Sequence, residues 1–147
     1  MYLIILKFFI MKYIVLLSAM FLLPCSQLFA QAPPYHVVFD VTTKDTNTHK
    51  AVIKWCNEIL AADPTAKVEV VYYAQSLEMI TQGKSVVGAE VSALAGKNVA
   101  FTVCAVAMKK WNIDKSQLLP GVVTVPDGIY EILLKQKEGY AYIKASL

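Results

Sequence analysis

The stretch Asn98–Lys110, which reads NVAFTVCAVAMKK, decides the fold of this chain. Val99–Val103 is an almost unbroken apolar run, which is the pattern of a strand buried on both faces. Cys104 follows at once, and Ala105–Lys110 has the composition of a short helix. The stretch therefore predicts a central strand of a parallel sheet that turns into a helix at a cysteine.

The same alternation of apolar strand and helix continues on both sides of this stretch. Alternating strands and helices indicate right-handed crossovers and a sheet covered on both faces. The sequence thus predicts an α/β fold: a three-layer α/β/α sandwich with an open, mostly parallel, five-stranded sheet. The expected strands are residues 35–41, 67–73, 98–103, 122–125 and 140–144, and the expected helical segments are residues 46–62, 75–80, 85–94, 105–112 and 129–137.

The first thirty residues differ in kind from the rest. A basic flank that includes Lys12 precedes the apolar run Tyr13–Leu23, and small and polar residues follow as far as Ala30. This is the three-part layout of a secretory signal peptide. We therefore expect residues 1–30 to be removed and residues 31–147 to form a single α/β domain, periplasmic or secreted.

Two other interpretations of this leader are open. An uncleaved anchor is disfavoured because Tyr13–Leu23 is shorter than the roughly 20 residues that span a bilayer. No stable membrane insertion is expected once the leader is removed. A lipoprotein, acylated at Cys25, is disfavoured because Pro24 directly precedes that cysteine. Leu28 is a weak point of the cleavage site, since a small residue is preferred there.

Charge excludes one class of partner. The chain carries a formal net charge of +3, contains no arginine, and has its lysines scattered among acidic residues. Bidentate readout of bases or phosphates relies on arginine, and attraction of a polyanion needs a basic patch. Nucleic acid is therefore not an expected partner.

Cys104 is the single candidate catalytic residue, as a sulfur acceptor. A residue at the end of a parallel strand lies at the carboxyl edge of the sheet, where such folds bind ligands. The unpaired N–H groups of a helix start also stabilise a thiolate. The alternative is a small core side chain, because Val103, Ala105 and Val106 around it are apolar.

The other thiol and the two histidines suggest no chemistry. Cys56 lies on the apolar stripe of helix 46–62, so we expect a core side chain about 15 Å from the edge that holds Cys104 and no disulfide between them. His36 falls in a strand, and His49 is expected on a helix surface. Neither has partners at the spacing of metal ligands, so no metal or cofactor site is expected.

Three further patterns have ordinary interpretations. Asp40 could face the same edge as Cys104 but reads better as a cap or loop residue. Tyr140 and Tyr142 alternate on one strand, which favours core or subunit packing. Gly83-Lys84-Ser85 resembles the end of a phosphate loop, yet Glu78 stands where that motif needs glycine.

An ordered series of motifs in the second half of the chain resembles a known family. The series is Val99–Cys104, then Leu118-Leu119-Pro120, then Val125-Pro126-Asp127-Gly128, then Gln136 with Glu138–Ile143. It is similar to the DsrE/DsrF-like family, and most similar to its exported single-domain members. The resemblance implies a three-layer α/β sandwich that assembles as a trimer or hexamer. It also implies a persulfide on the cysteine at the end of a central strand, which here is Cys104.

Two functions from different classes remain as expectations. The first is an exported sulfur carrier or thiol-redox protein that uses a persulfide on Cys104 and exchanges sulfur with a donor or acceptor protein. The second is a non-catalytic, oligomeric module that binds a small molecule or a protein, with Cys104 purely structural. A hydrolase is disfavoured because the sequence shows no Ser/His/Asp or Cys/His arrangement. Whether the protein is an enzyme is left open.

Overall fold

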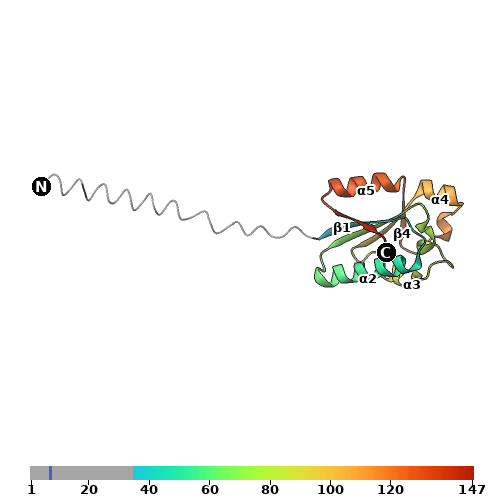
Figure 1. Cartoon of the computed structure of the whole chain (residues 1–147), viewed down its shortest axis with the longest axis horizontal. Helices are drawn as coiled ribbons and strands as arrows, with labels where there is room; N and C mark the ends of the chain where they lie inside the picture. The colour runs from blue at the N-terminus through green and yellow to red at the C-terminus, as the bar shows by residue number, and fades with distance from the viewer. Residues whose placement is uncertain (1–6, 8–34) are drawn as a thin grey trace. The chain divides into compact units, whose positions relative to one another are not determined.

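A five-stranded, all-parallel sheet forms the centre of the molecule. The computed structural model describes residues 35–147, together with Lys7. The strands run in the order β4-β3-β2-β1-β5, and every neighbouring pair is parallel, which confirms the predicted α/β sheet (Figure 1). Their bounds are β1 His36–Val41, β2 Lys67–Tyr72, β3 Val99–Cys104, β4 Val122–Val125 and β5 Ala141–Ala145.

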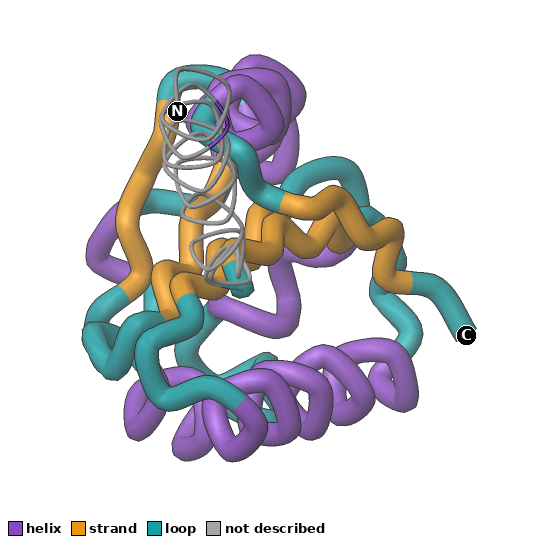
Figure 2. The backbone as a smooth tube through the Cα atoms, turned by 90° about the vertical axis from the view of Figure 1, so that its left-hand side faces the viewer, coloured by secondary structure: helices purple, strands orange, loops and turns teal. Residues whose placement is uncertain are grey.

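Helices cover the two faces of this sheet, as predicted. Figure 2 shows helices on both sides of the strands, and Figure 1 shows α2 and α3 on one side and α5 on the other. The expected helix at residues 75–80 is a 3-10 helix. The helices are α2 Thr46–Ala62, α3 Gly88–Leu94, α4 Ala105–Trp111 and α5 Gly128–Lys137, with 3-10 helices η1 Ser76–Ile80 and η2 Lys115–Gln117.

The two faces of the sheet differ in chemistry. The face covered by α2 and α3 carries the main core, which includes Phe39 and Phe101. The face covered by α5 has a small apolar core of three buried side chains, Val38, Val71 and Ile132. Because side chains alternate along a strand, the α5 face also receives the buried polar residues Asp40, Glu69 and Thr102. Polar chemistry is therefore concentrated under α5.

The apolar stripe of α5, formed by Ile129, Ile132 and Leu133, is only partly buried. Ile132 packs against the small core, whereas Ile129 is 58% exposed and Leu133 is 51% exposed. The physical reason is that α5 also turns Lys135 toward the buried Glu69, 3.5 Å from Nζ to Oε2, so one narrow side of the helix faces the sheet. The outer apolar side chains are left on the surface.

The predicted leader lies outside the described residues. The expected signal peptide at residues 1–30, its cleavage after Ala30 and the alternative acylation of Cys25 therefore remain predictions. Among the described residues, no helix combines the length and the apolar character needed to cross a bilayer.

Candidate functional site

Cys104 lies where the sequence predicted it, at the carboxyl end of β3. It is the last residue of that strand and the N-cap of α4. Its side chain makes no capping hydrogen bond, and the residue is only 6% exposed. The thiol is therefore free and buried at the start of α4, but it makes no hydrogen bond to the N–H groups there.

The start of α5 closes over Cys104 at Gly128. A Cβ on Gly128 would lie 3.2 Å from the Cβ of Cys104, 3.2 Å from Cγ1 of Val71 and 3.5 Å from the Cβ of Tyr73. Contacts below 3.4 Å are tight, so glycine is needed for this close approach. The first turn of α5 is already capped, because Asp127 Oδ1 accepts hydrogen bonds from the backbone N–H groups of Ile129 and Tyr130.

A buried carboxylate lies on the same face of the sheet. Asp40 is 4% exposed, and its Oδ2 accepts hydrogen bonds from Tyr142 Oη at 2.7 Å and Lys144 Nζ at 3.1 Å. Lys144 Nζ also donates to Thr42 Oγ1 at 2.9 Å. Asp40 Oδ1 is buried and has no hydrogen-bond partner among the described residues. This site therefore holds one unused, buried acceptor.

These contacts correct two predictions. Asp40 is a residue of β1 and not a cap or loop residue, because it lies in register with Val71 of β2 and Lys144 of β5. Tyr142 is not a core side chain, since it is 43% exposed and its hydroxyl donates to Asp40, whereas its predicted alternative role in subunit packing stays a prediction. Both residues are polar partners across neighbouring strands.

Tyr73 connects the carboxylate to the cysteine. Val71 is in register with Thr102, and two residues further along the chain are Tyr73, directly after β2, and Cys104, the last residue of β3. Both lie at the carboxyl edge on the α5 face, because an added Cβ on Gly128 would contact the Cβ atoms of both. Lys144 Nζ lies 5.8 Å from the centroid of the Tyr73 ring. Burial and the nearby Asp40 carboxylate raise the pKa of the Tyr73 hydroxyl, with a smaller contribution from Cys104. We call Asp40, Tyr73, Tyr142 and Lys144 the Asp40 cluster.

The second cysteine of the described region, Cys56, is buried and difficult to ionise. Cys56 is fully buried on α2, as predicted, and burial raises its pKa to about 12. Both cysteines of the described region are free, which agrees with the prediction that they form no disulfide. Thiol chemistry in residues 35–147 therefore falls to Cys104.

The histidines differ from each other. His49 is buried, contrary to the expected surface position, because its Nε2 lies 2.8 Å from the carbonyl oxygen of Thr43 and fastens the β1–α2 loop. His36 belongs to β1, and its ring centroid lies 5.0 Å from that of Tyr140. Within residues 35–147 no three His, Cys, Asp or Glu side chains are grouped closely enough to hold a metal ion.

Sequence reasoning missed the Asp40 cluster as a unit. One signal was available, because Asp40 interrupts the otherwise apolar strand VVFDV, and a charged residue in a buried strand needs partners. The partners come from β5, 102 and 104 residues later in the chain. Asp40 meets these partners only because β1 and β5 are neighbours in the sheet.

Replacing Tyr142 with phenylalanine should weaken the alkaline sensitivity of the fold. The hydrogen bond to Asp40 raises the pKa of Tyr142 from 10.0 to about 12. A raised tyrosine pKa contributes stability that is complete below pH 10 and is lost as the pH rises through the folded-state value. Urea unfolding between pH 8 and pH 12 should therefore show a shallower decline for Tyr142→Phe. An unchanged slope would contradict this assignment, and Tyr130→Phe, on exposed α5, serves as the control.

The site as a whole defines a class: an open parallel α/β sandwich with a free cysteine at the carboxyl end of a central strand. The family model that matches the chain is that of the DsrE/DsrF-like family, over residues 36–145. The protein belongs to the DsrE/DsrF-like family, as the sequence motifs indicated.

Two solved structures resemble the described domain. A protein of unknown function, MTH1491 from Methanobacterium thermoautotrophicum, is 30% identical, with a TM-score of 0.71 over 75% of this chain and 98% of that one. The ychN protein from E. coli is 9% identical, with a TM-score of 0.64 over 76% of this chain and 98% of its own, and shows the fold alone. No curated protein matches this chain.

Proposed function

We propose that this protein is an exported sulfur carrier or thiol-redox protein that holds sulfur as a persulfide on Cys104. One observation carries the proposal: a free cysteine ends a central strand on the face of the sheet that also holds the buried Asp40 carboxylate, one oxygen of which has no hydrogen-bond partner among the described residues. Membership of the DsrE/DsrF-like family supports it as well. A buried polar atom without a partner is rare in proteins and suggests a place that something else occupies.

The proposed reaction is thiol exchange and needs no further oxidant. The thiolate of Cys104 attacks the outer sulfur of a donor R–S–SH, a new S–S bond forms to Cys104, and the old S–S bond breaks. The proton of Cys104 ends on the leaving R–SH, so the products are Cys104–S–SH and R–SH. Transfer to an acceptor thiol is the reverse of this step.

The Asp40 cluster is suited to proton handling during this exchange. Tyr73 lies between Cys104 and Asp40, and it keeps its proton to high pH because burial and the carboxylate raise its pKa. It can therefore donate a hydrogen bond to a developing thiolate or persulfide. Lys144, 3.1 Å from Asp40 Oδ2, balances the negative charge of the carboxylate. In this role Asp40 and Lys144 are positioning residues.

Intact-protein mass spectrometry tests this proposal. Incubation of the purified protein with inorganic polysulfide should add the mass of one sulfur atom, and dithiothreitol should remove it. Cys104→Ser should abolish the adduct, whereas the matched variant Cys56→Ser should retain it, because Cys56 is buried with a raised pKa. Absence of an adduct, with Cys104 alkylated only after unfolding, would overturn the proposal.

The burial of Cys104 favours the second function, a non-catalytic binding module. At 6% exposure the thiol resembles a small core side chain. In that case Cys104→Ala should leave assembly and ligand binding unchanged and cost only packing energy. Loss of a sulfur-handling activity in a Cys104→Ser variant that still folds and assembles would exclude this alternative.

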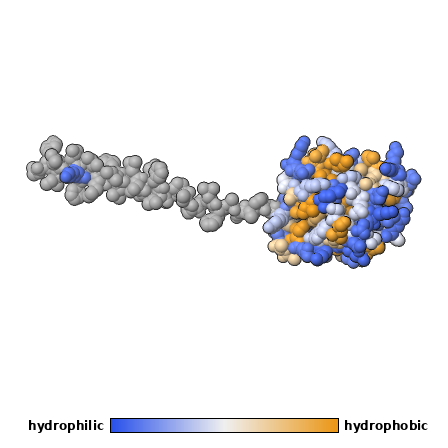
Figure 3. All heavy atoms as spheres, in the orientation of Figure 1, coloured by the Kyte–Doolittle hydropathy of each residue, from blue (hydrophilic) through white to orange (hydrophobic). Residues whose placement is uncertain are grey.

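We also propose that the protein is a homo-oligomer, a trimer or hexamer. Apolar side chains on α5 remain at the surface, and Val106, two residues after Cys104, is exposed as well. Figure 3 shows apolar side chains at the surface of the domain, including the region where Figure 1 places α5. Light scattering should give a multiple of the protomer mass, and Leu133→Glu should lower it.

Export is the remaining part of the proposal. The basic and apolar segments of residues 1–30 support it, because they have the layout of a cleavable leader. The N-terminus of protein recovered from the periplasm or the medium tests it. A chain beginning at Gln31 would support cleavage, and a chain retained in the cell with its leader intact would contradict it.

A further inference from the structure

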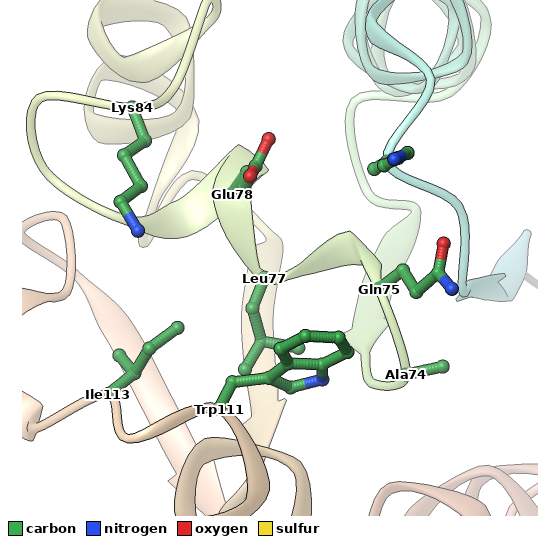
Figure 4. Close-up of a pocket in the computed structure, with 8 residues that line it drawn as sticks. Ala74, Gln75, Leu77, Glu78, Lys84, Trp111 and Ile113 are labelled. Carbon is green, nitrogen blue, oxygen red and sulfur yellow. The ribbon is translucent and has the colours of Figure 1, made fainter.

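A second hollow lies at the carboxyl edge, built from different residues than the Cys104 site. Its volume is about 240 Å³, close to the small end of small-molecule sites. Three segments meet there: the loop after β1, the stretch from the end of β2 through η1 to Lys84, and the end of α4 with the residues just after it (Figure 4). The lining residues are Lys44, Ala74, Gln75, Leu77, Glu78, Lys84, Trp111 and Ile113.

The apolar part of this pocket is a flat aromatic surface over a buried floor. Trp111 is 48% exposed although it is among the largest apolar side chains of the chain, and Leu77 beneath the pocket is buried. Figure 4 shows the Trp111 indole beside Leu77, with Ile113 to the left of both. An exposed indole in a concave site is a surface on which a planar ring can stack.

The walls of the pocket are held by hydrogen bonds. Ser76 Oγ donates to the carbonyl oxygen of Val41 at 2.7 Å, and Gln75 N–H donates to that of Thr42 at 3.0 Å. The backbone of Ala74 has a φ of 56°, in the left-handed region that is unfavourable for alanine. Such strained positions persist where the surrounding structure fixes them, often at ligand sites. The pocket is therefore pre-formed.

The polar part of the pocket is positive. Lys44 and Lys84 line it, and within the described residues neither forms an ion pair. Lys110 lies outside the lining, with its Nζ 5.9 Å from the Trp111 ring centroid, so the lining itself holds two lysines. Glu78 is the acid in the lining, and Figure 4 shows its carboxylate directed away from Trp111. The charge favours one anionic group and, because of Glu78, disfavours a dianion.

We propose that this pocket binds a small aromatic carboxylate. The ring stacks on Trp111 over Leu77, and the carboxylate accepts hydrogen bonds from Lys84 or Lys44. A monoanion fits better than a phosphate ester, since the chain has no arginine for bidentate phosphate binding and Glu78 repels a second negative charge. This inference does not rest on sulfur chemistry at Cys104.

The two tryptophans of the chain allow a direct test. In a proton–nitrogen NMR spectrum of the purified protein, each indole N–H gives one signal, and Trp111→Phe identifies that of Trp111. Titration with cinnamate should shift the Trp111 signal and leave that of Trp55, which stacks on Phe39 at 5.9 Å, unchanged. Cinnamamide, the neutral analogue of the same shape, should bind about tenfold more weakly, the loss expected for one charge-assisted hydrogen bond.

Variants separate the pocket from general charge effects. Replacing both Lys44 and Lys84 with glutamine should weaken cinnamate binding about tenfold and leave cinnamamide binding unchanged. Lys97→Gln, at an exposed lysine near the opposite edge of the sheet, should change neither. An unmoved Trp111 signal, or equal affinities for cinnamate and cinnamamide, would overturn the inference. Cys104→Ser should bind cinnamate normally, so this result and the polysulfide result can fail independently.

Discussion

Replacing Lys135 with methionine is expected to lower the free energy of unfolding by about 3 kcal/mol at pH 7, the cost of leaving a buried charge without its partner. Glu69 is 5% exposed, and its Oε2 lies 3.5 Å from Lys135 Nζ. Without Lys135, the remaining partner of the carboxylate is Thr102, whose Oγ1 donates to Oε1 at 3.1 Å. Chemical denaturation of the two proteins measures the difference.

The pH dependence of this loss identifies its cause. Burial raises the pKa of Glu69 in the folded protein. The positive charge of Lys135 lowers that pKa, but its effect is smaller than that of burial. A carboxyl group with a raised pKa favours the folded state below its ordinary value and disfavours it as the pH rises through the folded-state value. Removing Lys135 raises that pKa further. The penalty of Lys135→Met should therefore shrink as the pH falls through the raised pKa of Glu69 in the variant, which lies above the ordinary value of 4.5.

Two controls test whether the unpaired charge is responsible. Adding Glu69→Gln to Lys135→Met should restore most of the lost stability, because a neutral amide needs no cation. Lys137→Met, at an exposed position of the same helix, should change stability by less than about 0.5 kcal/mol. A double variant as unstable as Lys135→Met would instead assign the loss to the contact between Lys135 and the Tyr140 ring, at 5.4 Å from Nζ to centroid.

Gly121→Ala should destabilise the fold by about 3 kcal/mol, from backbone strain and overpacking together. Gly121 precedes β4 with a φ of +85°, and an added Cβ would lie 2.5 Å from the Cβ of Ala95. Ala95 cannot yield as a flexible side chain could, because its Cβ is fixed to the backbone where α3 ends. Either β4 or the end of α3 must move.

A matched glycine separates strain from collision. Gly83 has a similar φ of +73°, but nothing lies within 4 Å of an added Cβ. Gly83→Ala should cost only the strain, about 1 kcal/mol. The difference between the two variants in urea unfolding then measures the collision, and Ala95→Gly should relieve it in the Gly121→Ala background. Equal losses at both glycines would show that the collision contributes nothing.

The sequence was sufficient for features that depend on local pattern. The buried run Val99–Val103, with Cys104 directly after it, predicted a central parallel strand and the site at its end. Helix α2 begins at Thr46, as predicted, and Asp45 caps it, because its side chain accepts hydrogen bonds from the backbone N–H groups of Asn47 and Thr48.

Features that depend on distant residues were beyond local pattern. The donors to Asp40 come from β5, and the wall of Cys104 comes from Gly128 at the start of α5. Ile129 and Leu133 belong to the apolar stripe of α5 but are exposed, because α5 presents Ile132 and Lys135 to the sheet, where Lys135 pairs with Glu69. The helical periodicity of a sequence identifies the apolar face of a helix, but it does not show which side chains of the sheet that helix contacts.

The strand order has a consequence for how the protein is made. During synthesis, β1 emerges early and finds β2 within about one crossover, but its other edge stays open until β5 has been added. For that interval Asp40 lies on an unpaired strand edge without Tyr142 and Lys144, and unpaired edges recruit other chains. A charge on that edge discourages such pairing. The same carboxylate thus discourages pairing with other chains while the sheet is incomplete, and in the folded protein it lies on the same face of the sheet as Cys104.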